Sequence, residues 1–212
     1  MTDKIRKPED FKFLREAALK MGVKEAKIIP ASDIIIENRV TLKCRSGCIS
    51  YGNKLTCPPY APTPDEFRKI ASEYSFALLV KFPSDAELEP EVLHSIYRYC
   101  LDPNSPPDKK EKTDKFWKDW FKGTNVILPV MLELEKTAFN AGYTLAVALA
   151  NGPCNLCETC NVKGGICLHP TRARISGEAV GINIIKTAER AGMPIVFPFV
   201  KNPEPIALLL ID

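Results

Sequence analysis

Residues 128–150 read LPVMLELEKTAFNAGYTLAVALA, which combines a predicted amphipathic helix (128–141), a glycine (Gly142) and an apolar strand (143–150). A glycine directly after a helix adopts the left-handed conformation that ends helices, so Gly142 marks the boundary between the two elements. Because helices alternate with strands, the chain is predicted to adopt a layered α/β or α+β fold. Two further segments repeat the order: a helix over 11–21 with Gly22 and a strand over 26–29, and a helix over 178–191 with Gly192 and a strand over 194–200.

The rest of the chain completes a single predicted domain over residues 1–212. Apolar runs over 76–82 and 206–211 predict two more strands. Residues 84–125 depart from the alternation, because prolines punctuate the segment and charged residues crowd its second half. We interpret this segment as a helical insertion. Its aromatic residues recur at helical spacing, which favours a helix packed on the core over one that docks a partner or a membrane surface: Phe116, Trp117, Trp120 and Phe121.

The composition of the chain excludes several classes of protein. With 45% apolar and 26% charged residues, the sequence is typical of a folded protein in water. The net charge of +3 is too small to indicate a nucleic-acid partner by itself. No run of about 18 apolar residues is present to span a membrane, and the N-terminal residues lack the apolar core of a signal peptide. We therefore expect a cytoplasmic protein, in which clustered cysteines stay reduced and bind metals.

Four cysteines form the second cysteine group: Cys154, Cys157, Cys160 and Cys167. Three of them are spaced C-x2-C-x2-C, close to the ligand pattern of ferredoxin-type [4Fe–4S] clusters. Structural zinc is the alternative, although zinc usually takes two separated C-x2-C pairs or mixed Cys and His ligands. Six residues instead of three precede the fourth cysteine, so the assignment of Cys167 to this cluster or to a neighbouring one stays open. His169 is a candidate ligand, and a hydrogen bond to the cluster is its simpler role.

Cys44, Cys48 and Cys57 form the first cysteine group, in the pattern C-x3-C-x8-C-P-P. The third cysteine follows too late for the radical-SAM triplet. A second [4Fe–4S] cluster is the favoured interpretation, and zinc or unligated structural cysteines are the alternatives. Three thiols leave one iron of such a cluster without a cysteine. The candidates for that position are Cys100, a non-cysteine ligand, or an open site for solvent, sulfide or substrate, where the iron acts as a Lewis acid.

Both cysteine groups have similar surroundings, since each is followed by a proline, a helix and a strand. After the first group, residues 63–66 (TPDE) predict a capping box with proline at the first helical position. We interpret the two regions as duplicated cysteine loop–helix–strand units, with the metal clusters in loops at strand ends. Glu178 begins the helix after the second group, where a carboxylate favours the helix dipole. Basic residues flank both groups and either offset cluster charge or dock an acidic partner or an anionic substrate: Arg45, Lys54, Lys163, Arg172 and Arg174.

The cysteine patterns resemble those of a family of predicted metal-binding proteins common in anaerobic bacteria and methanogenic archaea. The resemblance spans about residues 10–212 and implies metal binding through these cysteines and an anaerobic host, but no reaction. The long 84–125 segment departs from the family's pattern. The matching patterns are Cys44-x3-Cys48-x2-Tyr51-Gly52-x4-Cys57-Pro58-Pro59, Asn151-Gly-Pro-Cys154-x2-Cys157-x2-Cys160-x6-Cys167-x-His169-Pro170 and Arg174-x3-Glu178-x2-Gly181-Ile182.

The sequence thus predicts an iron–sulfur protein with one or two [4Fe–4S] clusters, acting in electron transfer with a redox partner protein. The first alternative is an enzyme for desulfuration or sulfur transfer, in which the three-cysteine cluster keeps an open iron; no catalytic residue is assigned. The second is a zinc-stabilised protein that binds a partner through the aromatic helix. The sequence assigns no oligomeric state. The predicted ligands are Cys44, Cys48, Cys57, Cys154, Cys157, Cys160 and Cys167.

Overall fold

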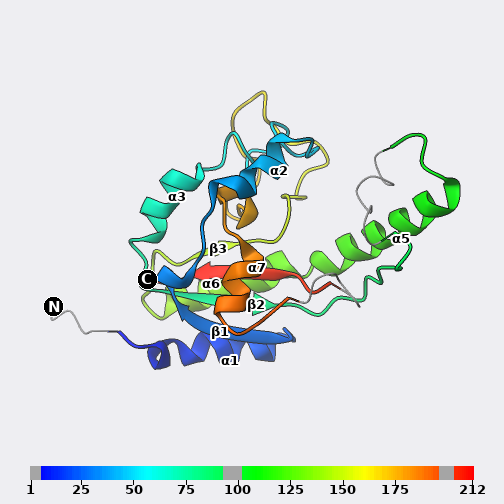
Figure 1. Ribbon diagram of the computed structural model, residues 1–212. Coiled ribbons are helices and arrows are strands. Elements are labelled where there is room, and N and C mark those ends of the chain that lie inside the picture. The colour runs from blue at the N-terminus through cyan, green and yellow to red at the C-terminus, as the bar shows by residue number, and fades with distance from the viewer. Residues whose placement is uncertain (1–5, 93–101, 196–202) are drawn as a thin grey trace.

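The centre of the fold is a four-stranded sheet (Figure 1), in a computed structural model that describes residues 6–92, 102–195 and 203–212. The strand order is β1-β2-β4-β3, and every neighbouring pair is antiparallel. Antiparallel pairing makes this an α+β fold, one of the two classes predicted. The strands are β1 (Glu25–Pro30), β2 (Phe76–Lys81), β3 (Val147–Leu149) and β4 (Ile206–Leu210).

The two central strands, β2 and β4, are apolar on both faces. Leu78 of β2 points into one core and Leu79 into the other, because successive side chains of a strand alternate between faces. The register places Leu78 beside Leu209 and Leu79 beside Leu208 of β4. Both faces of the sheet therefore need cover, and the helices supply it.

Helices pack on both faces of the sheet, which gives three layers (Figure 1). Leu14, Met131 and Leu134 are buried against one face. Phe67, Val180 and Ile182 are buried against the other. The first face is covered by η1 (Pro8–Phe11), α1 (Lys12–Lys20) and α6 (Ile127–Asn140), and the second by α3 (Pro64–Ala71), η4 (Glu178–Val180) and α7 (Ile184–Arg190).

Three short helical segments connect β1 to α3, and one long helix projects from the body of the molecule. The short segments are η2 (Ala31–Asp33), η3 (Asn38–Thr41) and α2 (Leu42–Arg45). The long helix is α5 (Pro107–Thr124), which lies in the segment interpreted as an insertion (Figure 1). Its aromatic residues form one row of ring contacts, in which Phe116 is buried and Phe121 is 42% exposed. None of the helices within the described residues is long and apolar enough to cross a membrane.

The strand predicted over 143–150 is shorter than expected. Only Val147–Leu149 pair with β4. Residues 143–146 form turns instead, and the Tyr143 N–H donates a hydrogen bond to the Ala138 carbonyl at 3.1 Å. The ring of Tyr143 packs against Phe11 and Phe13. Contacts with the ends of α1 and α6 therefore take these residues out of the sheet.

The helix predicted over 178–191 is interrupted, and this part of the prediction is wrong. Gly181 ends η4 with a left-handed φ of +89°, and α7 begins only at Ile184. Between them Ile182 forms a β-bridge with Ile36, which requires extended backbone. Asn183 then caps α7 by accepting a hydrogen bond from the Lys186 N–H at 3.1 Å. The strand predicted to follow, over 194–200, falls mainly outside the described residues.

The predicted capping box before α3 is confirmed. The Thr63 N–H donates to Glu66 Oε2 at 2.7 Å, and the Glu66 N–H donates to Thr63 Oγ1 at 3.3 Å. The two bonds satisfy backbone donors that the first turn of a helix leaves unpaired. They fix the point at which the chain leaves the first cysteine group. Duplication of the two cysteine regions and the limits of the insertion stay predictions.

Candidate metal centre

The second cysteine group lies on a loop that is closed at its base. Directly after β3, Ala150 forms a parallel bridge with Ser176, and the Ala150 N–H donates to the Ile175 carbonyl at 2.9 Å. All four cysteines lie between these two points. The edge of the sheet therefore fixes both ends of the loop that carries them.

The four thiols of this group line one hollow: Cys154, Cys157, Cys160 and Cys167, together with His169. Backbone amides point at the sulfurs, since the His169 N–H donates to Cys167 Sγ at 3.4 Å and the Leu156 N–H donates to Cys154. Burial raises the pKa of Cys154, and the nearby thiols of Cys167 and Cys157 add to the rise. A metal that binds here must displace protons from the thiols.

The loop of the first cysteine group completes the wall of the same hollow. Lys54, Leu55 and Thr56 line it, although they lie between Cys48 and Cys57 in the sequence. The Leu55 N–H donates to Cys160 Sγ at 3.4 Å. The Lys54 ammonium interacts with one thiol of each group. Its positive charge lowers the pKa of Cys57 and of Cys154, against the rise that burial causes in both. The two groups therefore share one end of the molecule, where Figure 1 shows the loops around α2 beside the loop that follows β3.

The first cysteine group is built from α2 and the turns that follow it. Cys44 lies in α2, Cys48 is exposed and Cys57 is buried. Burial raises the pKa of Cys57 to about 11, with a further contribution from the Cys48 thiol. Burial also raises the pKa of Cys44, and Cys48 adds to that shift. The three thiols are therefore close enough to interact electrostatically.

The base of the first loop is joined to the segment that follows the second loop. The Glu37 N–H donates to the Gly181 carbonyl at 2.8 Å, and the Asn183 N–H donates to the Ile35 carbonyl at 2.8 Å. The Glu37 carboxylate accepts hydrogen bonds from the side chains of Arg39, Lys186 and Asn183, which lower its pKa to about 2. Residues 176–183 thus connect the bases of both cysteine loops.

Glu178 lies in this connecting segment, and its surroundings differ from those that the sequence predicts. Its Oε2 atom is buried, and no group in the described parts of the chain offers that oxygen a hydrogen bond. Burial raises the pKa of Glu178, against hydrogen bonds from its own N–H and the Ser176 side chain. After burial and Cys48, the Glu178 charge also raises the pKa of Cys44. The η4 segment packs against η3, which leads directly into α2 and Cys44. An interaction with the helix dipole explains little here, because η4 has only three residues.

Arg174 also differs from the expectation that it offsets cluster charge. Its Nε donates to Glu135 Oε2 at 2.8 Å, and its Nη2 pairs with Glu135 Oε1. The two side chains are only 16% and 19% exposed, and Glu135 Oε2 also accepts the Ala148 N–H at 2.7 Å. The ion pair therefore fastens the exit of the second cysteine loop to α6 and β3.

The seven predicted cysteine ligands stay predictions. None of the seven described cysteines is in a disulfide bond. Within residues 6–92, 102–195 and 203–212, no three Cys, His, Asp or Glu side chains are grouped to hold a single metal ion. Cys100, the candidate fourth ligand of the first group, lies outside the described residues.

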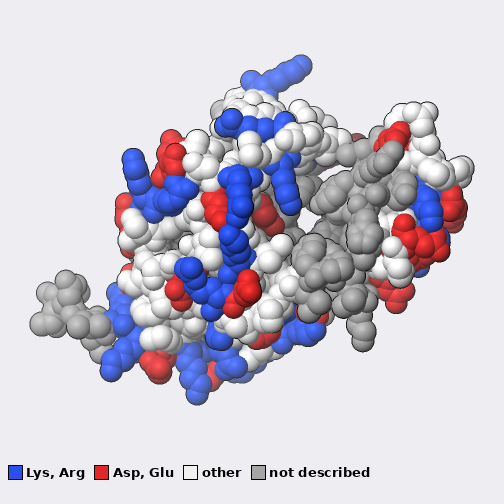
Figure 2. Space-filling model, in the orientation of Figure 1, with Lys and Arg blue, Asp and Glu red and all other residues white. Residues whose placement is uncertain are grey.

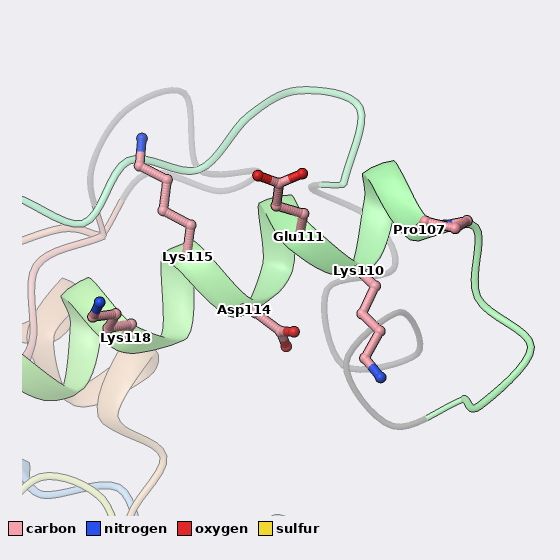
Figure 3. A pocket seen from close by; sticks show the side chains of 6 residues that line it. All are labelled: Pro107, Lys110, Glu111, Asp114, Lys115 and Lys118. Atoms are coloured by element: carbon pink, nitrogen blue, oxygen red, sulfur yellow. The ribbon is translucent and has the colours of Figure 1, made fainter.

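Another hollow lies along α5 and is a poor candidate for a metal (Figure 3). Its lining comes from one helix, and the charged side chains extend to different sides of that helix. They include neither cysteine nor histidine: Pro107, Lys110, Glu111, Asp114, Lys115 and Lys118. The two cysteine groups are therefore the site to which the chemistry points.

Comparison with known proteins supports metal binding. Residues 27–211 match a family model described as "Predicted metal-binding protein (DUF2284)". The chain belongs to this family. The matched region includes both cysteine groups and the connecting segment 176–183. No curated protein and no solved structure matches the chain. Membership in this family supports metal binding but does not identify the metal.

Proposed function

We propose that this chain holds two [4Fe–4S] clusters, one at each cysteine group, and acts in electron transfer. The observation that carries the proposal is the hollow lined by four thiols of the second group and closed by residues 54–56 of the first loop. Thiolates are the usual ligands of iron–sulfur clusters. When bound, such clusters supply one-electron redox chemistry.

The donor set of the second group fits a cluster. Each iron of a cubane takes one thiolate, so the four sulfurs have to surround a space instead of converging on one ion. Cys154, Cys157, Cys160 and Cys167 line one hollow, which supports this arrangement. Amide donors to the sulfurs, from Leu55 and His169, are the contacts by which proteins tune a cluster's reduction potential.

The two sites are neighbours, which supports electron transfer between them. The Leu55 amide contacts Cys160 of the second group, and Leu55 is two residues from Cys57 of the first. Lys54 lies near thiols of both groups and partly offsets the negative charge of their thiolates. An electron held at one site therefore has a short path to the other.

The surface around the sites suits a redox partner. Apolar side chains are exposed next to the cysteines, and Figure 2 shows basic side chains projecting from the end of the molecule that carries α2. Transient electron-transfer complexes use small interfaces of this kind. The exposed apolar residues are Leu42 (58% exposed), Ile49 (79%), Ile166 (69%) and Leu168 (61%).

The enzyme hypothesis is favoured by one observation, the exposure of Cys48. The first group offers three thiols within the described residues, and Cys48 stands at the surface. In this hypothesis the iron without a cysteine shares the exposure of Cys48 and binds sulfide or a small thiol. A spectral change of the cluster on addition of either compound would favour this function over simple electron transfer.

Anaerobic purification followed by iron and sulfide analysis tests the proposal. We expect about eight irons and eight sulfides per chain, since each cubane holds four of each. The brown colour should bleach reversibly with a low-potential reductant. Cys157→Ala should lose about half of the iron, whereas Thr159→Ala in the same loop should keep it all. A colourless protein with bound zinc, or full iron in Cys157→Ala, would contradict the proposal.

A further inference from the structure

We infer that the surface formed by residues 38–60 and 151–175, which we call the cysteine face, docks an electron-transfer protein through an acidic patch on that partner. The inference rests on the proposed function and adds the charge of the partner to it. The two segments form one surface, because the Leu55 N–H of the first donates to Cys160 Sγ of the second at 3.4 Å.

The charge of the chain is divided between this face and the rest of the molecule. Residues 38–60 and 151–175 carry seven Lys or Arg and a single carboxylate, that of Glu158. The rest of the chain carries 22 Lys or Arg and 25 Asp or Glu. The net charge of +3 therefore conceals a basic cysteine face on an otherwise slightly acidic protein.

Two of the seven basic residues are occupied inside the protein. Arg39 pairs with Glu37, and Arg174 pairs with Glu135. Lys54 is only partly exposed and lines the hollow of the second group, where it offsets thiolate charge. These three cations are directed at groups of the chain itself, which leaves four for a partner.

The other four cations form the basic rim of the face, and all are exposed. Within the described residues, none of them pairs with a carboxylate. Figure 2 shows Lys and Arg side chains projecting among uncharged atoms at the end that carries α2. Complementary charge gives an interface its specificity and its association rate, so this rim fits an acidic surface. The rim consists of Lys43, Arg45, Lys163 and Arg172.

Apolar side chains on the same face favour a protein over a nucleic acid as the partner. Four of its five exposed large apolar residues are aliphatic, and each lies within two residues of a cysteine: Leu42, Ile49, Ile166 and Leu168. Exposed apolar groups rimmed by polar residues mark protein interfaces. Single-stranded nucleic acid is bound instead by stacking of successive bases on aromatic rings, and Tyr60 is the one exposed ring of this set.

A partner on this face would lie next to the proposed redox site. Cys48, a predicted ligand, is exposed there. In each transfer one electron leaves a reduced cluster of this chain and reduces the partner's cofactor by one electron. No covalent bond of the chain forms or breaks in that step.

The test is a calorimetric titration of the full chain, purified anaerobically, with flavodoxin as an acidic probe and cytochrome c as a basic one. All proteins are oxidised, so binding is measured without electron transfer. Raising the salt from about 10 mM to about 0.1 M shortens the screening length from about 30 Å to about 10 Å. We expect this change to weaken flavodoxin binding by about tenfold, and cytochrome c to bind no better at low salt.

Charge reversal on the rim locates the docking surface. Lys43→Glu combined with Arg45→Glu should weaken flavodoxin binding at low salt by about tenfold or more, because two attractions become repulsions. Lys163→Glu tests the other loop and should weaken binding by a smaller factor, also if the double variant does not fold. Lys20→Glu is the control, since Lys20 is exposed on α1, at the end of the molecule away from α2, and should change binding by less than about twofold (Figure 1).

A second pair of variants tests the apolar contacts. Ile49 is 79% exposed on the cysteine face, and Leu145, between α6 and β3, is 78% exposed away from it. Ile49→Ser should weaken flavodoxin binding at both salt concentrations, because apolar contact is not screened by ions. Leu145→Ser should leave the affinity unchanged. Equal effects of the two would show that the cysteine face is not the contact surface.

The outcomes separate the inference from the function on which it rests. A chain without cluster iron would overturn both. If the clusters are present and reducible, the inference alone is overturned when flavodoxin does not bind, or binds equally in high salt and in the rim variants. It is also overturned if a single-stranded oligonucleotide binds more tightly than flavodoxin and loses that binding in Lys43→Glu with Arg45→Glu, since nucleic acid would then be the occupant.

Discussion

At the scale of single residues, the ion pair between Glu135 and Arg174 connects the second cysteine loop to the body of the protein. Glu135→Ala would leave the Arg174 guanidinium and the Ala148 N–H without their shared acceptor, in a place where both side chains are largely buried. We expect the free energy of unfolding to fall by roughly 2–3 kcal/mol, measured by urea titration.

The neighbouring Glu133 supplies the control for this prediction. It lies on the same helix and pairs with Lys136 at 3.3 Å, but both side chains are more than half exposed. Exposed pairs contribute little, so Glu133→Ala should change the stability by less than about 0.5 kcal/mol. Equal effects of the two substitutions would show that the burial of the Arg174 pair does not matter.

At the scale of elements, the turn between η4 and α7 depends on Gly181. Gly181→Ala would place a side chain in the left-handed region and against Pro64, whose Cβ lies 2.7 Å from the added atom. Backbone strain and the overlap with Pro64 together should lower the free energy of unfolding by about 2–4 kcal/mol. Gly142→Ala at the end of α6 has a similar φ of +96° but open space around it, so only the strain of about 1 kcal/mol is expected.

The measurement is again urea unfolding, with iron content as a second readout. Because the Gly181 carbonyl accepts the Glu37 N–H at the entrance to the first cysteine loop, Gly181→Ala should also bind less iron than Gly142→Ala. Identical stabilities of the two variants would show that Pro64 moves aside without cost. Identical iron contents would show that the position of η4 does not govern the first site.

Local patterns in the sequence identified most elements, and long-range contacts account for the errors. β2, β4 and the Thr63 capping box follow from neighbouring residues, so periodicity and spacing predicted them. The break after η4 depends on the pairing of Ile182 with Ile36, which are far apart in the sequence. The spacing of the cysteines grouped the four thiols that line the hollow, and their role as ligands stays a prediction. Residues 54–56 reach the hollow only through tertiary contacts.

At the scale of the whole molecule, the four thiols that line the hollow lie outside the apolar cores. Two apolar cores fill the faces of the sheet, and none of the four thiols that line the hollow belongs to either. We expect removal of metal by an anaerobic chelator to increase hydrogen exchange in residues 44–60 and 151–175, while β2 and β4 stay protected. Mass spectrometry of the exchanged peptides measures this. Loss of protection throughout the sheet would show instead that the metal holds the entire fold together.

The place of β4 in the sheet has a consequence for biosynthesis. β4 lies between β2 and β3, yet it follows every cysteine in the sequence. As the chain leaves the ribosome, all the thiols emerge before the strand that unites their scaffold has been translated. The nascent protein must therefore pass through a stage in which all its thiols are carried by an unfinished sheet, so any metal that binds before the last strand has docked meets loops whose bases are not yet held together.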